Sequence, residues 1–142
     1  MAGYSGTPLP KKLGINAGSR IALLHAPDGF DDTLGELPDD VTFVRSPTGN
    51  LDVIVAFVTE RSHLERAIDL LARAIFPDGG IWIAWPKKAS KVPTDMNEDV
   101  VRDVALPRGL VDNKVCALDE TWSGLRIVWR KERRSGPPPG VG

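Results

Sequence analysis

Apolar residues fall into short runs separated by turn residues, which is the pattern of an α/β protein. Two runs are mostly apolar and predict buried strands, at 20–26 (RIALLHA) and 51–58 (LDVIVAFV). The β-branched and aromatic run at 41–44 and the run at 80–85 predict two further strands. The apolar runs are all strand-sized, so none is long enough to span a membrane.

The strongest helical pattern begins at Ser62, where Glu65 completes a capping box. The apolar residues that follow repeat at the spacing of one helix face: Leu64, Ile68, Leu71 and Ile75. The sequence FPDGG then ends the helix. We expect this apolar stripe to face the sheet.

Two weaker helical segments are also predicted. Residues 29–37 form a short helix that Pro38 ends. Residues 95–106 form the other, and Asp95 with Glu98 makes a capping box at its start.

The last two apolar runs, 113–118 and 125–130, flank the polar turn DETWSG and predict a closing hairpin. Strands that alternate with helices predict a three-layer, Rossmann-like α/β fold, with a mostly parallel sheet of about six strands and a C-terminal antiparallel hairpin. Between the second and third strands only about six residues are available, whereas a parallel crossover normally needs about a dozen. Either the chain crosses in extended form, or this pair departs from the doubly wound order.

Composition indicates a soluble protein with one domain. The 142 residues are 42% hydrophobic and 26% charged, which fits one domain at 13–131 between flexible tails at 1–12 and 132–142. The net charge of −1 favours neither nucleic acid nor a membrane as partner. A lone cysteine, Cys116, and two histidines make a disulfide framework or a metal site unexpected. No secretory signal is visible, so we expect a cytoplasmic protein.

Segments of the second half resemble the class I methyltransferase fold. LARAIFPDGGIWIAW is similar to its helix that closes on Pro-x-Gly-Gly before the fifth strand, and GLVDNKVCALD with GLRIVWRK is similar to its closing hairpin. The resemblance implies a truncated methyltransferase core. Two of that family's cofactor contacts are missing, because the turn HAPDGF holds a single glycine and a proline, and VRSPTG holds no carboxylate. We therefore expect no cofactor, and no binding of S-adenosylmethionine at micromolar concentration.

A second resemblance covers nearly the whole chain. SGTPLPKKLGI, LLHAPDGF, WIAWPKKAS and VCALDETWSGLRIV together resemble an uncharacterised family of small bacterial proteins, a domain of unknown function well represented in actinobacteria. This resemblance implies no mechanism.

Candidate site residues follow from the position of the strand ends. Ligands of open α/β sheets bind outside the carboxyl ends of the strands. The residues after three of the strands are therefore candidates for binding: His25, Asp28, Trp85, Lys87, Lys88, Asp119, Glu120 and Trp122. Parallel strands end on the same side, so we expect Lys87 or Lys88 to lie near Asp119, Glu120 or His25.

Each candidate also has a structural interpretation. The lysines either bind an anion such as phosphate or carboxylate, or are solvated charges. Asp119 and Glu120 are a base or ligand contact, or residues of a hairpin turn. Trp122 either covers the edge or folds back on the hairpin. His25 fits a hydrogen-bonded structural histidine better than a catalytic one.

The first functional hypothesis is a non-enzymatic module, small-ligand-binding or regulatory, which recognises a small anionic ligand or a protein partner at this edge. The alternative is a divergent methyltransferase-like enzyme with a non-standard site made from His25, Lys87 and Asp119. A scaffold that acts through its tails is a third class. The oligomeric state stays open.

Overall fold

A six-stranded sheet forms the middle of the protein, in the order β2-β1-β3-β4-β6-β5. The computed structural model describes residues 7–139. Its strands are β1 Arg20–Leu24, β2 Thr42–Phe43, β3 Val53–Phe57, β4 Gly80–Pro86, β5 Leu110–Ala117 and β6 Trp122–Trp129. Neighbours among β1 to β4 are parallel, and β6 is antiparallel to both β4 and β5. The predicted mostly parallel sheet with a closing hairpin is confirmed.

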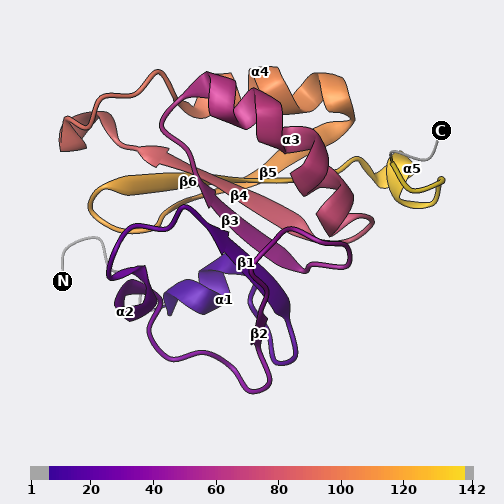
Figure 1. Ribbon diagram of the computed structural model, residues 1–142, viewed down its shortest axis with the longest axis horizontal. Helices are drawn as coiled ribbons and strands as arrows, with labels where there is room; N and C mark the ends of the chain where they lie inside the picture. The colour runs from indigo at the N-terminus through magenta and orange to yellow at the C-terminus, as the bar shows by residue number, and fades with distance from the viewer. Residues whose placement is uncertain (1–6, 140–142) are drawn as a thin grey trace.

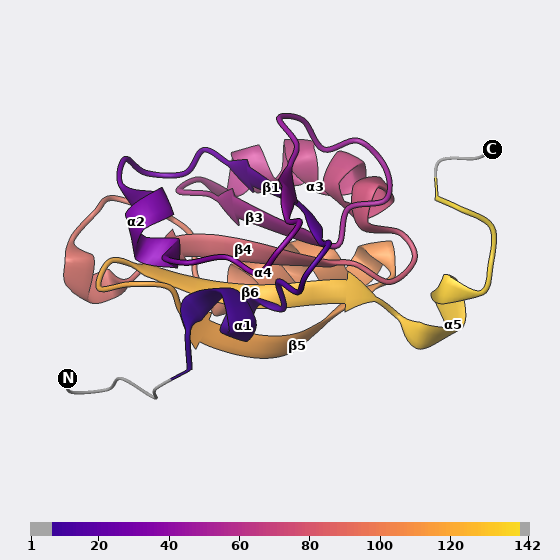
Figure 2. The ribbon, with the colours of Figure 1, turned by 90° about the horizontal axis from the view of Figure 1, so that it is seen from below.

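Helices cover both faces of this sheet. They are α1 Leu9–Leu13, α2 Phe30–Leu34, α3 Arg61–Ile75, α4 Glu98–Ala105 and α5 Lys131–Arg134, with short 3-10 turns η1 Lys88–Ser90 and η2 Leu106–Arg108. Figure 1 shows α3 and α4 on one side of the sheet and α1 and α2 on the other, and Figure 2 shows the same layers from below. The three-layer architecture is confirmed.

Two apolar cores lie on the two faces of the sheet. Because successive strand residues point to opposite faces, Ile54 packs on the α3 side while its neighbours Val53 and Val55 pack on the α1 side. The predicted stripe of α3 is buried, with no member more than 2% exposed: Leu64, Ile68, Leu71 and Ile75. The stripe therefore faces the sheet, as its spacing predicts.

The capping box predicted at Ser62 and Glu65 is wrong. Helix α3 begins one residue earlier, at Arg61, and the Arg61 amide donates a hydrogen bond of 2.7 Å to Oδ1 of Asp95. Glu65 instead accepts from Nε of Arg61 at 3.2 Å. The cap comes from a residue 34 positions away in the sequence, which a local motif cannot reveal.

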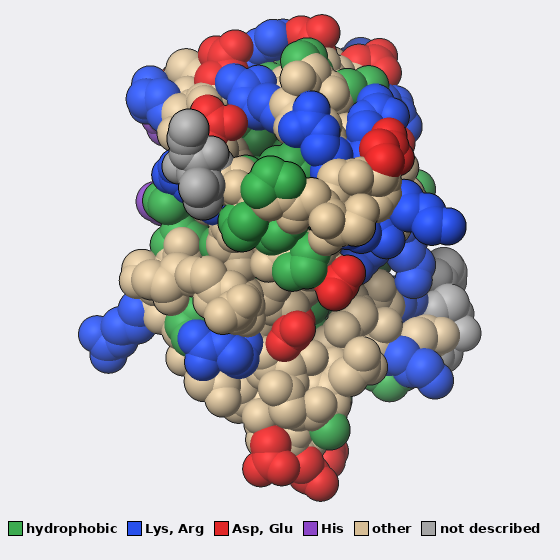
Figure 3. All heavy atoms as spheres, turned by 90° about the vertical axis from the view of Figure 1, so that its right-hand side faces the viewer, with side chains coloured by type: hydrophobic (Ala, Val, Ile, Leu, Met, Phe, Trp, Pro, Cys, Tyr) green, Lys and Arg blue, Asp and Glu red, His purple; other side chains and the backbone are tan. Residues whose placement is uncertain are grey.

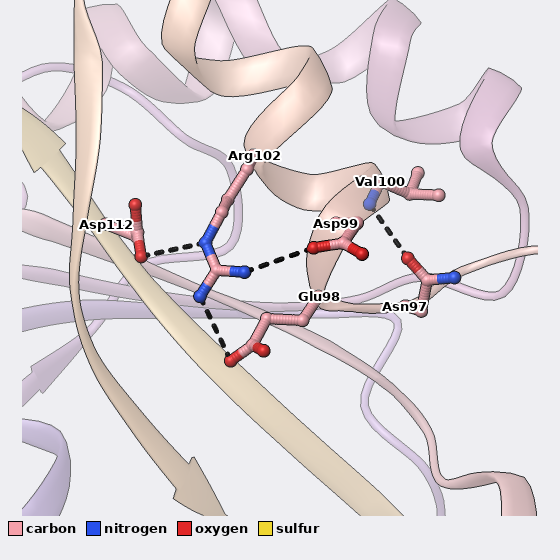
Figure 4. Close-up of polar contacts among 6 residues, drawn as sticks. All are labelled: Asn97, Glu98, Asp99, Val100, Arg102 and Asp112. Atoms are coloured by element: carbon pink, nitrogen blue, oxygen red, sulfur yellow. Dashed lines mark hydrogen bonds and ion pairs between the residues drawn. The ribbon is translucent and has the colours of Figure 1, made fainter.

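The predicted start of α4 is also wrong, because Asp95 caps α3. Asn97 caps α4, and its Oδ1 accepts a hydrogen bond of 2.9 Å from the amide of Val100. Figure 4 shows how Arg102 then ties α4 to the sheet, with its Nε 3.1 Å from Oδ2 of Asp112 on β5. Glu98 and Asp99, on the first turn of α4, hold the other two guanidinium nitrogens at 3.3 Å.

The short connection between the second and third strands crosses the sheet without a helix. β1 pairs with β2 on one side and with β3 on the other, so residues 44–52 must pass over β1. Val44 packs against the α3-side core, and its amide donates to the Ile21 carbonyl at 2.8 Å. Of the two alternatives left open by the sequence, the direct crossing without a helix is observed, although its backbone bends at 45–46 and 49–50 and is not extended throughout.

The structure differs from the predicted N-terminal tail, because Leu9–Leu13 forms α1. Leu13 is fully buried, and its carbonyl accepts a hydrogen bond of 3.0 Å from Nε1 of the buried Trp82. Gly14, with a φ of 84°, ends the helix in the left-handed conformation. The predicted C-terminal tail at 132–142 is likewise not all tail, because α5 Lys131–Arg134 extends into it. Residues 1–6 and 140–142 of the two predicted tails lie outside the described residues.

Truncation of the α3 stripe tests this packing. We expect Leu71→Ala to lower the free energy of unfolding by about 2–5 kcal/mol, because it opens a cavity in the core. Leu70 is the matched control: it is 47% exposed, so Leu70→Ala is expected to change stability by about 0.5 kcal/mol or less. Urea denaturation measures both, and equal losses would show that the stripe does not face the sheet.

Candidate functional site

The carboxyl ends of β1, β3 and β4 lie on one edge of the sheet, because the three strands are parallel. The antiparallel pairing of β4 with β6 places Trp122 directly opposite Pro86. The β5–β6 turn, 118–121, therefore reaches the same edge, at the left of Figure 1. The predicted meeting of the three candidate loops is confirmed.

Lys87 joins the loop after β4 to the hairpin turn. Its backbone amide donates to the Thr121 carbonyl at 2.7 Å, and its Nζ donates to the Asp119 carbonyl at 2.8 Å. The expected proximity of Lys87 and Asp119 is confirmed. The contact uses a backbone carbonyl, so it leaves the carboxylate of Asp119 free for another role.

That role is to build the turn. Oδ1 of Asp119 accepts hydrogen bonds of 2.8 Å from the amides of both Thr121 and Trp122. This Asx-type geometry supports the structural interpretation of Asp119. Glu120, the next residue, is exposed at the tip of the turn.

Trp122 covers the edge of the sheet. Its ring meets Phe57, at the end of β3, edge to face with a centroid distance of 5.0 Å. Phe57 in turn meets Phe30 of α2 at 4.9 Å in the same geometry. Of the two roles considered for Trp122, packing on the strand end is therefore the one observed.

A cavity of about 580 Å³, called the edge pocket below, opens between the carboxyl ends of β1 and β3 and residues 63–71 of α3. Its apolar wall comes chiefly from Leu24, Leu64 and Leu71, with the ring of Trp122 beside them. Its polar groups are those of four residues: His25, Thr59, His63 and Arg66. A mostly apolar pocket of this size with a few polar groups is typical of small-molecule sites.

His25 occupies a strained position at the mouth of the edge pocket. Its φ of 58° is in the left-handed region, which costs a residue other than glycine about 1–2 kcal/mol. The side chain is exposed and makes no hydrogen bond or ion pair with any residue of the described range. The expected hydrogen bond of a structural histidine is therefore wrong, since no hydrogen bond or ion pair in 7–139 holds the imidazole in place.

A second cavity, called the lysine groove below, lies on the other face of the sheet. It measures about 1180 Å³ and runs between α1, the end of α2 and the β5–β6 turn. Lys12 and Lys87 line it, together with the candidates Asp119 and Glu120.

Cys116 lies on β5 beside this groove and is half-buried. Burial raises the pKa of its thiol, while the positive charges of Lys12, Lys114 and Lys87 act in the opposite direction. The desolvation effect is the larger one, so Cys116 stays a protonated thiol near neutral pH.

The eight candidates therefore do not form one site. His25 and Trp122 line the edge pocket, whereas Lys87, Asp119 and Glu120 line the lysine groove. The remaining three line neither of these cavities: Asp28, Trp85 and Lys88. Trp85 is only 8% exposed and packs in the α3-side core, and Asp28 and Lys88 are exposed.

Several lining residues escaped the sequence analysis. Thr59 follows β3, and applying the strand-end rule to that strand as well would have found it. His63 and Arg66 lie on the exposed side of α3, where no sequence signal separates them from solvated residues. Lys12 falls in the predicted N-terminal tail, although Leu9 and Leu13 have the i, i+4 spacing of a helix face.

The opposite edge, at the amino ends of the parallel strands, has a different character. Figure 3 shows basic side chains there interspersed with acidic ones. α5 belongs to this side and contributes Lys131, Arg133 and Arg134. Within 7–139, no group of three or more acidic, histidine or cysteine side chains is placed to hold a metal ion, and no helix has the length and apolar character to cross a membrane.

Comparisons with known proteins relate the chain to one fold. No family model and no curated protein matches the sequence. A SAM-dependent methyltransferase from Aquifex aeolicus is 17% identical, over 82% of this chain and 85% of that one, with a TM-score of 0.60. The fibrillarin pre-rRNA processing protein of Methanococcus jannaschii is 12% identical, over 89% and 70%, with a TM-score of 0.56.

A third solved structure is magnesium protoporphyrin IX methyltransferase from Synechocystis with bound SAM. It is 11% identical, over 86% of this chain and 74% of that one, with a TM-score of 0.55. At such low identity these similarities establish the fold alone. The protein has a methyltransferase-like Rossmann core, as the resemblance in its second half implies.

The structural role of Asp119 can be tested by stability. Asp119→Ala removes the acceptor of two backbone amides, so we expect a loss of about 1–3 kcal/mol in the free energy of unfolding. The matched control is the exposed neighbour in Glu120→Ala, expected to change stability by about 0.5 kcal/mol or less. If the Asp119→Ala protein is as stable as the control, the carboxylate of Asp119 does not stabilise the turn.

Proposed function

We propose that this chain is a divergent methyltransferase-like protein that binds a small organic ligand in the edge pocket. The similarity to several methyltransferases favours this interpretation over the non-enzymatic module that heads the functional hypotheses. We also propose that the chain is a member of the bacterial family of unknown function that its sequence resembles.

The observation that carries the proposal is the strained, unpartnered His25 at the mouth of this pocket. A left-handed residue other than glycine is unfavourable, and such strain is concentrated at functional sites. No hydrogen bond or ion pair within 7–139 accounts for the imidazole. A contact with a ligand would explain why a histidine side chain is placed at this position, since no interaction within the described fold does so.

The lining of the pocket suggests the chemistry of the ligand. The apolar wall and the ring of Trp122 suit a flat or branched apolar body. Arg66 on the rim has no carboxylate within ion-pair distance in the described range, so it is free to meet an acidic group. His63, which pairs with Glu60 at 3.2 Å, is a less available donor.

A thermal-shift screen against nucleotides, S-adenosylmethionine and small carboxylated or phosphorylated metabolites would identify ligand classes. A ligand at 100 times its dissociation constant adds about 2.7 kcal/mol of stability, which raises the melting temperature measurably. We expect at least one class to do so. A flat profile across all classes would contradict the proposed binding function.

Binding of S-adenosylmethionine distinguishes an active methyltransferase from a protein that has the methyltransferase fold but binds another ligand. Pro27 removes a backbone donor from the turn after β1, and the residues after β2, Val44 to Ser46, include no carboxylate for ribose hydroxyls. We therefore expect isothermal titration calorimetry to show no binding with a micromolar or better dissociation constant. Tight, stoichiometric binding would instead make methyl transfer the leading function.

The role of His25 is tested by removing its side chain while relieving its backbone. His25→Gly is expected to leave the melting temperature unchanged or higher, because glycine accepts the φ of 58° without strain. It should weaken binding of any ligand identified in the screen by about tenfold, which corresponds to the loss of roughly 1.4 kcal/mol.

The matched control is Asn50→Gly. Asn50 also has a positive φ, of 67°, but lies in the β2–β3 crossing and lines neither cavity. This variant should bind like the wild type. If His25→Gly also binds like the wild type, the imidazole is not a ligand contact.

A further inference from the structure

Two lysines line the groove beside Cys116, Lys12 and Lys87, and a third, Lys114, lies on the same strand as the thiol. Lys12 lies in the last turn of α1, and Lys87 follows β4. Lys114 lies two residues before Cys116 on β5, so these two side chains share a face of the sheet. The charged groups that act on the thiol are these three lysines. None of them has a carboxylate within 4.0 Å in the described part of the chain.

Three acidic residues line the groove, Glu36, Asp119 and Glu120, and none of them forms an ion pair with these lysines in the described part of the chain. Oδ1 of Asp119 is engaged by two backbone amides, and Glu36 and Glu120 are exposed. The bond from Nζ of Lys87 to the Asp119 carbonyl uses one of its three donors and fixes the ammonium group beside the groove. Two donors and the full charge of Lys87 therefore remain for a ligand.

The rest of the groove wall is largely apolar. Pro8, Leu9 and Pro10 contribute from the α1 side, and Leu37 and Pro38 from the segment after α2. A surface that joins unpaired cations to an apolar wall suits a ligand with an anionic head and an apolar body. Lysine ammonium groups act as point charges that donate hydrogen bonds, so they bind a carboxylate or a phosphate equally well.

We propose that the lysine groove binds a small amphiphilic anion, with its carboxylate or phosphate group between Lys12 and Lys87 and its apolar body along Leu9 and Leu37. This site is on the face of the sheet opposite the α3-side edge pocket. The inference does not depend on what the edge pocket binds, so either site can fail its test while the other stands.

Cys116 supplies a built-in reporter, because it is the single cysteine of the chain. The probes are octanoate, octyl phosphate, uncharged octanol and inorganic phosphate, each below any micelle-forming concentration. The measurement is the rate at which neutral iodoacetamide alkylates the thiol near neutral pH. An anion among the lysines cancels their field and raises the pKa of the Cys116 thiol, and each unit lowers the reactive thiolate about tenfold.

We expect octanoate or octyl phosphate to slow alkylation by about tenfold, with octanol and inorganic phosphate having much smaller effects. The comparison of the two amphiphiles identifies the preferred head group. If octanol protects as well as the amphiphiles, or inorganic phosphate does, the combined recognition of head and body is wrong. If neither octanoate nor octyl phosphate slows alkylation of Cys116, the proposed anion site is wrong.

Lysine variants show whether the protection comes from this cluster. Lys12→Gln and Lys87→Gln should slow alkylation without any probe, because each removes a charge that lowers the pKa of the thiol. Both should also lose most of the protection by the amphiphile. No hydrogen bond within 7–139 joins the Lys12 side chain to the turn, so the Lys12→Gln variant keeps the test valid even if Lys87→Gln loosens the loop.

The matched control is Lys88→Gln, which removes the same charge from an exposed neighbour outside the groove. It should keep both the basal alkylation rate and the protection. Equal loss in Lys88→Gln, or full protection in Lys12→Gln and Lys87→Gln, would overturn the proposed site. Circular dichroism melting of each variant confirms that the fold is retained.

Discussion

The antiparallel pairing of β6 with β4 is the constraint on which the candidate sites depend. It runs from Ile81 opposite Ile127 to Pro86 opposite Trp122. This register carries the β5–β6 turn to the carboxyl edge, where Lys87 bonds to it twice. It also carries Trp122 to Phe57 at the end of β3. A shift by one residue would move Trp122 to the other face and separate these contacts.

The helix-free crossing from β2 to β3 lies apart from the edge pocket. Residues 44–52 contain no helix, and Val44 of the crossing packs against the α3-side core near Ile21, at the start of β1. The edge pocket opens at the other end of β1, beside Leu24 and His25, and no residue of the crossing lines it. A shortened core therefore still presents a cavity at the edge where ligands of open α/β sheets bind.

The hydrophobic pattern predicts the architecture well, because burial alternates with a period of two in strands and 3.6 in helices. The pattern correctly predicts the sheet, the buried stripe of α3 and the closing hairpin. It fails at helix α1, where two prolines and two lysines suggest a tail although Leu13 is buried against Trp82. It also fails at the helix caps, since the amide of Arg61 is satisfied by Asp95 from a distant loop.

The candidate site was predictable as an edge and not as a set of residues. Sequence identifies which side of the sheet the loops share, because parallel strands end together. It does not show that Trp85 turns toward the α3-side core, nor that Lys87 and His25 open into different cavities. Those facts depend on where each side chain points at the last residues of a strand and on which helix covers that face.

The central claim is that the edge pocket is the ligand site, and amide chemical-shift mapping by NMR tests it most directly. Titration with a ligand from the thermal-shift screen should perturb the amides of Leu24, His25 and Thr59 and the indole N–H of Trp122 together, at one dissociation constant. Perturbations that leave these groups unchanged and gather elsewhere, for example around Lys12 and Ala117, would contradict the claim.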